Sequence, residues 1–397
     1  MTKLAAAEPG ATGRDGDQTM SRRATPIAFV SVVLPCLNEA AAVTATVAEA
    51  RRGLAATGLP GEVLVVDNGS SDDSIVLASA AGARVVREAV RGYGAAIAAG
   101  IAAARGDVII MADADHTYDL ERLGGLLAPL TTGADLVIGT RLQGAIAAGA
   151  MPGWHRYLGT PVLTTSLAIA AGARVSDSQS GYRAFRRETI LGLGLRARGM
   201  EFASEMLLRA GRAGLTVVEV PVDYRVRVGE SKLSPLGDGW RHVHLLMLLT
   251  PHLSLIVPGI LATLVGLALS LISLVATTGI EVGSVRWLPV FLGPMLLILG
   301  VQAGFLGCLA AHRSALTPAR VRRRLTWLDR PDAIGRLLGG FALLAGLGIL
   351  IDAGLLLLWL AGRSGPELLG VAGLAQALIV IGGGGMTTLF AAGYLER

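Results

Sequence analysis

Cysteine is scarce in this sequence, and the excess of positive charge is small. Only Cys36 and Cys308 occur among 397 residues, too few for a disulfide framework and without the spacing of a metal site. We therefore expect a reducing, cytoplasmic environment. The formal net charge of +5 is modest, and we expect no nucleic acid among the partners.

The first residues also have little of the pattern that a signal peptide would show. Residues 1–26 are rich in Ala, Gly, Thr and charged side chains, and they lack the continuous apolar core of an export signal. A segment of this composition buries too little apolar surface to fold, so we expect a disordered lead over 1–26. Nothing in it predicts export of the residues that follow.

Apolar residues are abundant instead. They make up 52% of the chain, whose mean hydropathy of +0.57 is above that of an ordinary soluble protein. The excess lies after about Trp240, in four runs that each reach the roughly 20 residues needed to cross a bilayer as a helix. These runs cover 253–276, 287–311, 335–361 and 369–393. The sequence thus predicts a transmembrane domain with four helices over 252–397.

The connection between the second and third runs is rich in arginine. It contains Arg313, Arg320, Arg322, Arg323, Arg324, Arg330 and Arg336, whereas the other two connections each hold one Arg and one acid. The positive-inside bias places this connection in the cytoplasm. We favour a topology signal over dedicated lipid recognition for these arginines. An even number of spans then places the preceding half of this multi-pass membrane protein in the cytoplasm as well.

The first half alternates short apolar runs with helical patterns. The runs are AFVSVVLPC, EVLVVD, ARVVR, DVIIMA, DLVIGT and LTVVEVPV. Such interleaving predicts an α/β fold with a doubly wound, mostly parallel sheet, which we place at 27–233. Ligands of such sheets bind beyond the carboxyl ends of the strands. That rule selects CLNE, DNGSSDD and DADHTYD.

Two aspartates follow the run DVIIM directly. Asp113 and Asp115 are one residue apart, so in an extended segment their side chains point the same way and can share one ion. Hard oxygen ligands of this kind suit Mg or Mn. The alternative is that Asp115 or Thr117 caps a helix that begins near Asp119. We favour the metal site because the pair follows a buried strand.

Two further segments have both a structural and a functional interpretation. In VVDNGSSDDS, Asp67 ends an apolar run, and turn chemistry and contact with a nucleoside explain it equally well. In RGYGAAIAAGI, Gly92 and Gly94 form a weak phosphate-loop pattern, which close helix packing also explains. We assign no phosphate to that segment from its spacing.

Cationic residues gather before the first apolar run. Arg225 and Arg227 alternate on one face of an extended segment, and Lys232 follows a glycine turn. Contact with an anionic lipid headgroup and simple snorkelling at the interface remain alternatives. The next residues, 234–251, predict an amphipathic helix in the membrane interface.

Taken together and in order, the segments LPCLNE, VVDNGSSDDS, RGYGAAIAAGI, ADADHTYDLERL, GTRL, DSQSGYRAFRRE, EFASEML and RVRVGESKL resemble one family. It is that of the polyprenyl-phosphate (dolichyl-phosphate) hexose synthases of glycosyltransferase family two. The resemblance covers about residues 28–245. It implies a GT-A type fold that uses a nucleotide sugar in the cytoplasm.

The resemblance also implies roles for single residues. The nucleotide-sugar contacts it implies are Pro35, Glu39, Asp67, Asp113 and Arg141, and Arg141 also matches the acceptor side. The implied ligands of Mg or Mn are Asp113 and Asp115. The implied acceptor-phosphate contacts are Arg225, Arg227 and Lys232, and the implied catalytic residues are Asp115, Asp177 and Arg225. Two positions depart from the family, namely Asn68 for a second Asp and Thr117 for Gln, and the latter leaves the third metal ligand open.

The implied reaction is an inverting transfer of glucose or mannose from a UDP- or GDP-sugar to polyprenyl or dolichyl phosphate. Asp177 is expected to orient this acceptor rather than deprotonate it, because a phosphate monoester is already anionic at neutral pH. Two alternatives are a processive polysaccharide synthase, whose Q-x-x-R-W stretch is absent here, and a non-catalytic nucleotide-sugar-binding regulator of a lipid carrier. The protein acts at a membrane in each case, and a homo-oligomer is compatible with all three.

Overall fold

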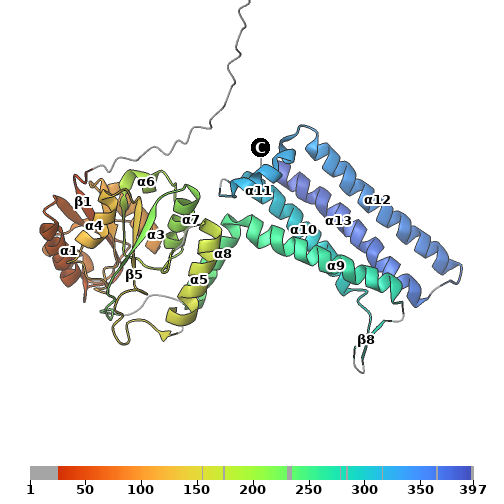
Figure 1. Ribbon diagram of the computed structural model, residues 1–397, viewed down its shortest axis with the longest axis horizontal. Helices are drawn as coiled ribbons and strands as arrows, with labels where there is room; N and C mark the ends of the chain where they lie inside the picture. The colour runs from red at the N-terminus through yellow and green to blue at the C-terminus, as the bar shows by residue number, and fades with distance from the viewer. Residues whose placement is uncertain are drawn as a thin grey trace, which may run out of the picture.

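The computed structural model describes residues 26–153, 155–172, 175–229, 235–277, 279–282, 285–314, 316–363 and 365–394. It consists of an α/β region followed by a region of long helices (Figure 1). The predicted lead, apart from Pro26, lies outside the described residues, and so does Lys232.

A seven-stranded sheet forms the centre of the α/β region, with strand order β3-β2-β1-β4-β6-β5-β7. All neighbouring strands are parallel except that β6 runs antiparallel to β4 and β5. The strands are β1 Val30–Cys36, β2 Gly61–Asp67, β3 Arg84–Arg87, β4 Val108–Met111, β5 Leu136–Thr140, β6 Arg183–Arg186 and β7 Val217–Pro221. The predicted doubly wound, mostly parallel sheet is confirmed.

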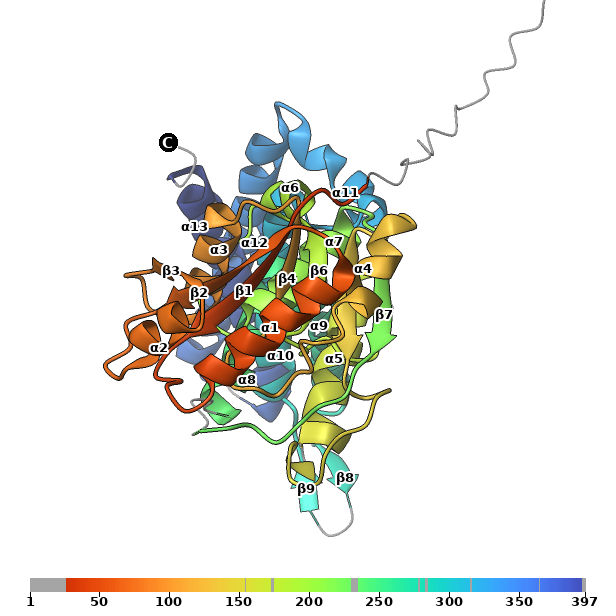
Figure 2. The same ribbon diagram turned by 90° about the vertical axis from the view of Figure 1, so that its left-hand side faces the viewer.

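Helices cover both faces of this sheet, as Figures 1 and 2 show. One apolar core lies under α1 Val43–Thr57, α2 Ser74–Ala80 and α4 Gly124–Thr131. The other lies under α3 Tyr93–Ala103, α5 Thr160–Ala171, α6 Arg187–Leu191 and α7 Phe202–Arg212, on the side nearer the long helices. Because both faces are covered, the central strands β1 and β4 are almost continuously apolar and buried.

Strand β6 was not expected, because the sequence DSQSGYRAFRRE is typical of a polar loop that caps a helix. Its first residue, Arg183, is fully buried. The Arg183 guanidinium donates hydrogen bonds to the carbonyl oxygens of Ser178, Ser180 and Ala203 at 2.7 to 2.9 Å. These bonds satisfy a cation that would otherwise be costly to bury, and they fix the segment that precedes the strand.

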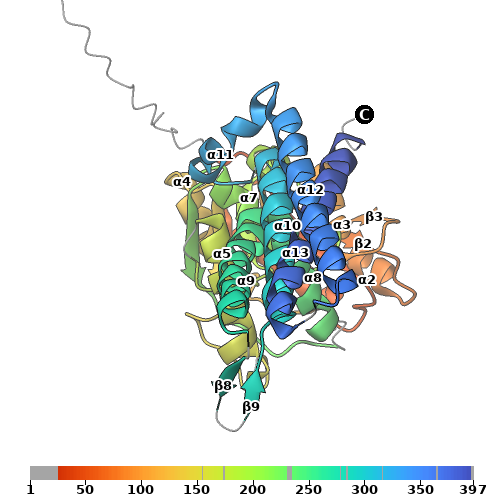
Figure 3. The ribbon, with the colours of Figure 1, turned by 90° about the vertical axis from the view of Figure 1, so that its right-hand side faces the viewer.

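In its described residues, the second region contains four helices long and apolar enough to span a membrane. They comprise His252–Val275 (a π-helical turn and α9), α10 Leu292–Arg313, α12 Ala333–Leu360, and Pro366–Gly393 (a 3-10 turn and most of α13 Leu369–Tyr394). Figure 3 shows them side by side. The four predicted helices are confirmed, although the second begins at Leu292 rather than 287. A short hairpin, β8 Ile280–Val282 and β9 Val285–Trp287, precedes it. The arginine-rich connection contains α11 Ala319–Arg324.

Glycines set the distance between these helices. A Cβ at Gly259 of α9 would lie 2.6 Å from the backbone N of Gly304 in α10, and one at Gly348 of α12 would lie 2.6 Å from the carbonyl oxygen of Ala375 in α13. Such close approach suits helices in lipid, where packing replaces the hydrophobic effect as the source of association. The helices therefore form two tight pairs, α9 with α10 and α12 with α13, joined through α10 and α13.

Candidate active site at the carboxyl ends of β1 and β4

A cavity of about 380 Å³ lies where β1 and β4 end. Among the residues that the structure describes, the charged lining consists of the acids Glu39, Asp113 and Asp115 and the arginines Arg91, Arg141, Arg227 and Arg241. The acids come from segments that follow the two central strands, and the arginines come from four separate parts of the chain. The cavity therefore brings carboxylates and guanidinium groups together beyond the carboxyl ends of the strands.

The paired aspartates after β4 lie in this lining. The Tyr93 hydroxyl donates a hydrogen bond to Asp113 Oδ1 at 3.1 Å, and the Thr117 hydroxyl donates to Asp115 Oδ1 at 2.7 Å. The helix that follows, α4, begins only at Gly124 and has no side-chain cap. Capping therefore does not explain Asp115 or Thr117.

The two carboxylates repel each other. Burial, together with the negative charge of Asp115, raises the pKa of Asp113 to about 7. A divalent cation beside both groups would remove this repulsion. The described residues contain no cluster of three or more His, Cys, Asp or Glu placed to hold a metal. Two carboxylates nevertheless fit Mg or Mn, which keep several waters and bind substrate phosphates. Thr117 orients Asp115 through its hydroxyl.

The predicted nucleoside contacts divide into two groups. Pro35 and Glu39 line the cavity, whereas Asp67 does not. The Asp67 carboxylate instead accepts hydrogen bonds from the backbone N–H groups of Gly69 and Ser70, at 3.1 and 2.9 Å. Its next neighbour, Asn68, does line the cavity. Asp67 thus shapes the turn beside the cavity, in line with the structural interpretation of this residue.

Asn68 ties this turn to the segment before α3. Its side-chain amide donates to the carbonyl oxygens of Glu88 and Val90, at 3.1 and 2.8 Å, and accepts from the N–H of Gly92 at 2.7 Å. An aspartate cannot donate these two bonds. Gly92 itself has φ +137°, and a Cβ there would overlap the carbonyl oxygen of Arg198. Close packing therefore accounts for the glycine.

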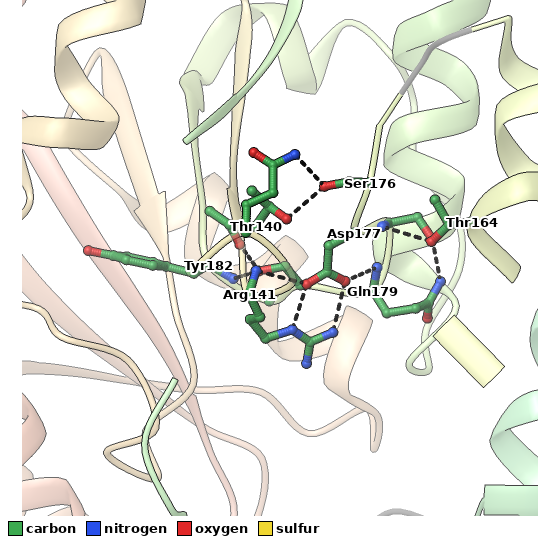
Figure 4. A network of polar contacts seen from close by, with 12 residues as sticks. Thr140, Arg141, Thr164, Ser176, Asp177, Gln179 and Tyr182 are labelled. Carbon is green, nitrogen blue, oxygen red and sulfur yellow. Dashed lines mark hydrogen bonds and ion pairs between the residues drawn. The ribbon is translucent and has the colours of Figure 1, made fainter. Parts of the chain in front are cut away.

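Arg141 and Asp177 form a buried ion pair (Figure 4). Arg141 Nε and Nη2 lie 2.7 and 2.9 Å from the two carboxylate oxygens, and the Arg141 backbone N–H also donates to Asp177 Oδ2 at 3.1 Å. Asp177 is fully buried and does not line the cavity, whereas Arg141 does. Asp177 thus binds Arg141 on the side away from the cavity and fixes its position.

The two arginines of the RVR segment point to different partners. Arg225 pairs with Glu49 at 2.9 Å and Asp119 at 3.3 Å, and it does not line the cavity. Arg227 pairs with Glu39 at 2.9 Å, lies 3.6 Å from Asp115, and does line it. The structure thus brings Arg227, and not Arg225, to the other predicted site residues.

Comparison with known proteins identifies the family of this chain. Residues 31–191 match the family described as Glycosyl transferase family 2. The low-salt glycan biosynthesis hexosyltransferase Agl6 of Haloferax volcanii is 35% identical over 338 residues, which cover 84% of this chain and 81% of the relative. The chain belongs to glycosyltransferase family 2.

Other similar proteins cover mainly the first half of this glycosyltransferase. The dolichyl-phosphate hexose transferase of Haloferax volcanii is 33% identical over 53% of this chain and 89% of its own length. Among solved structures, glucosyl-3-phosphoglycerate synthase from Mycobacterium tuberculosis, in complex with Mn²⁺, uridine-diphosphate-glucose and phosphoglyceric acid, is 28% identical. It covers 56% of this chain and 79% of that chain, with a TM-score of 0.43.

Several cavity residues of this glycosyltransferase were not identified from its sequence. They are Arg91, Tyr93, Tyr118, Gln179, Tyr224 and Arg241. The Tyr118 and Tyr224 rings lie 5.4 Å apart, and the Arg141 guanidinium lies 5.1 Å from the Tyr224 ring centre, in cation–π range. Gln179 and Tyr93 belong to the motifs DSQSGYRAFRRE and RGYGAAIAAGI, in which other residues were singled out from the sequence. Arg241 lies in the helix predicted to lie in the membrane interface, where a cation is expected even if it contacts no ligand.

Proposed function

We propose that this glycosyltransferase transfers a hexose, glucose or mannose, from a UDP- or GDP-sugar to polyprenyl or dolichyl phosphate, with inversion. The observation that carries the proposal is the cavity in which paired carboxylates and arginines share one lining. A sugar diphosphate and a lipid phosphate are both anionic, so the cavity must neutralise three phosphate groups. The names of relatives that act on dolichyl phosphate support the acceptor class.

On the donor side, Asp113 and Asp115 would hold Mg or Mn against the diphosphate, as a Lewis acid that neutralises charge on the leaving group. Pro35 and Glu39 border the nucleoside part of the cavity, next to the turn built by Asp67 and Asn68. Arg227 keeps Glu39 in place and sits between it and Asp115. The paired aspartates, Pro35 and Glu39 bind and orient the donor, and they need no proton transfer.

On the acceptor side, the nucleophile is a lipid phosphate oxygen, which attacks the anomeric carbon as the bond to the nucleoside diphosphate breaks. The second pKa of a phosphate monoester is about 6, so this oxygen is already anionic and needs no strong base. Arg141, held by Asp177, and Arg227 supply the guanidinium groups that orient it. Attack from the face opposite the leaving group gives inversion. Lys232, the remaining proposed contact, follows Arg227 by five residues.

The cytoplasmic side of the membrane is the proposed location of the catalytic region. Four candidate spanning helices follow it, and the arginines of the connection between α10 and α12 favour the cytoplasm for that connection. An even number of crossings returns the chain to the side on which it started. Protease accessibility of the catalytic region in sealed inverted vesicles tests this orientation.

The decisive experiment is transfer of radiolabelled sugar from a panel of UDP- and GDP-hexoses to polyprenyl phosphate by the purified protein. Each donor is tested with Mg, with Mn and with a chelator. A labelled lipid formed from one donor and lost with the chelator is expected, and it would name the sugar. Absence of labelled lipid with every donor, from protein that still binds a nucleotide, would refute the proposal.

A further inference from the structure

Helix α8, Pro235–Leu249, joins the catalytic region to the first spanning segment, which begins at His252 (Figure 1). At 100° per residue, His242, Leu246 and Leu249 fall within about 60° of one another on the helix. His242 is buried, and the two leucines pack against the core under α3, α5 and α7. One face of α8 is therefore fixed to the catalytic region.

A second face of α8, about 120° around the helix from the first, carries exposed apolar side chains. Trp240, Val243 and Met247 also fall within about 60° of one another, and Trp240 is 64% exposed. An exposed apolar face on a helix next to a spanning segment suits the membrane surface. Arg241 lies between the two faces and lines the cavity, about three helical turns before the spanning segment.

A chain of hydrogen bonds links the fixed face of α8 to the Arg141–Asp177 pair. His242 Nδ1 and Ser204 Oγ, both buried, lie 2.9 Å apart. Gln179 Nε2 donates to Ser204 Oγ at 3.2 Å, and the Gln179 backbone N–H donates to Asp177 Oδ1 at 3.3 Å. The residue next to Arg241 is thus connected to the group that positions Arg141.

Arg141, Arg227 and Arg241 all line the cavity. Arg141 and Arg227 are the guanidinium groups already proposed to orient the acceptor phosphate. A phosphate monoester carries almost two negative charges at neutral pH. A further guanidinium from the element nearest the membrane would meet an acceptor phosphate that arrives from the lipid side.

We propose that Arg241 of α8 contacts the acceptor phosphate, and that the chain from His242 through Ser204 and Gln179 positions it relative to Arg141. This inference rests on the proposed function in its choice of acceptor. From the sequence, α8 was expected only to lie in the membrane interface. The inference adds a binding residue on this helix and makes α8 part of the acceptor site.

The main test replaces Arg241 by Ala and by Lys in the full-length protein in detergent. The probes are a short-chain polyprenyl phosphate and the matching neutral polyprenol. For Arg241→Ala we expect binding of the polyprenyl phosphate to weaken about tenfold or more, because a charge-assisted bond to phosphate is lost. Arg241→Lys should recover part of it. The KM for the nucleotide sugar should change by less than about twofold, since the donor side is left intact.

Two variants serve as controls. Arg322→Ala removes an exposed arginine of α11, which does not line the cavity, and should leave binding of the polyprenyl phosphate unchanged. His244→Ala removes an exposed side chain of α8 that stacks on Trp240 at 6.5 Å, and should likewise leave it unchanged. A loss in Arg322→Ala equal to that in Arg241→Ala would mean that general surface charge, not Arg241, attracts the lipid.

The positioning chain has its own measurement. Ser204→Ala should raise the KM for polyprenyl phosphate by about three- to tenfold without raising the KM for the donor. The double variant with Arg241→Ala should be no worse than Arg241→Ala alone, because coupled residues are not additive. If the losses of acceptor binding from Ser204→Ala and Arg241→Ala were additive, the two residues would act independently. The proposal that Ser204 helps to position Arg241 would then be wrong.

The outcomes distinguish this inference from the proposed function. If the protein transfers sugar to polyprenyl phosphate and Arg241→Ala has an unchanged acceptor KM, Arg241 is not an acceptor contact, and the proposed function stands. If the protein transfers no sugar but binds polyprenyl phosphate in a manner that depends on Arg241, the proposed function fails and the contact stands. Equal binding of the neutral polyprenol would overturn the phosphate contact.

Discussion

In the catalytic region the large apolar side chains lie inside, whereas in the four-helix region many of them lie outside. Ile110 and Met111 of β4 are completely buried, but Leu343 and Leu350 of α12 are 73% and 70% exposed. Gly348, of the same helix, is buried against α13. Water drives the first arrangement, and lipid, which is as apolar as leucine, permits the second.

The two regions therefore depend on different interactions. The catalytic region combines an apolar core with buried ion pairs whose partners are far apart in the sequence, such as Arg141 with Asp177. The helices of the second region pack through glycines at short distances. A substitution that damages one region should leave the other folded, and the following predictions test this separation.

The largest effect is expected for Asp115→Asn. It removes one carboxylate of the proposed metal pair, and transfer to polyprenyl phosphate should fall by about 1000-fold or more because charge on the leaving diphosphate is no longer neutralised. The radiolabel assay at saturating Mg or Mn measures it. Asp73→Asn, an exposed acid at the start of α2 that makes no side-chain cap, is the matched control. Undiminished metal-dependent transfer by Asp115→Asn would remove the basis for the metal site.

A large loss of stability is expected for Asp177→Ala. The Arg141 guanidinium, only 11% exposed, would lose its carboxylate partner. Leaving one charge of a buried pair uncompensated typically costs about 3 to 5 kcal/mol. Limited proteolysis in detergent detects unfolding of the catalytic region and so measures this cost. The four-helix region should stay protected from the protease. Adding Arg141→Ala should restore part of the loss, and a purely additive double variant would contradict the coupling.

A smaller loss of stability, confined to the four-helix region, is expected for Gly300→Ala in α10. The new Cβ would overlap the backbone N of Thr263 in α9. Overpacking of this kind typically costs about 1 to 3 kcal/mol, so the helices should separate at lower temperature while nucleotide binding persists. The matched control is Gly304→Ala in the same helix, where a Cβ meets nothing within 4 Å. Equal shifts in both variants would point to helix propensity instead of packing.

The smallest perturbation is alkylation of the two cysteines, one in each region. Burial raises the pKa of the Cys36 thiol to about 11, so little thiolate exists at pH 8. Alkylation of Cys36 by iodoacetamide should be roughly 100-fold slower there than that of a free thiol, and it should rise about tenfold per pH unit up to pH 10.

Cys308, within α10, should react slowly at every pH because lipid excludes the water-soluble reagent. Mass spectrometry of the labelled peptides follows both residues. Reaction of Cys308 with the same pH slope as Cys36 would place that part of α10 in water, and the contrast between the two regions would then fail.

Much of this molecule follows from local patterns in the sequence. The four apolar runs predict the four long helices because length and hydropathy alone decide whether a helix can cross lipid. The alternation of apolar strands with helical segments predicts the parallel part of the sheet. The aspartates after DVIIM lie at the cavity, as expected, because ligands collect beyond the carboxyl ends of such strands.

Contacts between distant residues required the tertiary structure. Arg225 and Arg227 are two residues apart, yet Arg225 pairs with Glu49, 176 residues earlier, while Arg227 pairs with Glu39, 188 residues earlier. Strand β6 depends on three carbonyl acceptors for Arg183, and Asp177 is hidden behind Arg141. The sequence alone determined every strand of the sheet except β6, the four long apolar helices and the acidic pair, since periodicity and length are local properties. Folding decided which charges face the cavity, because the direction of a side chain depends on partners that the chain brings together from afar.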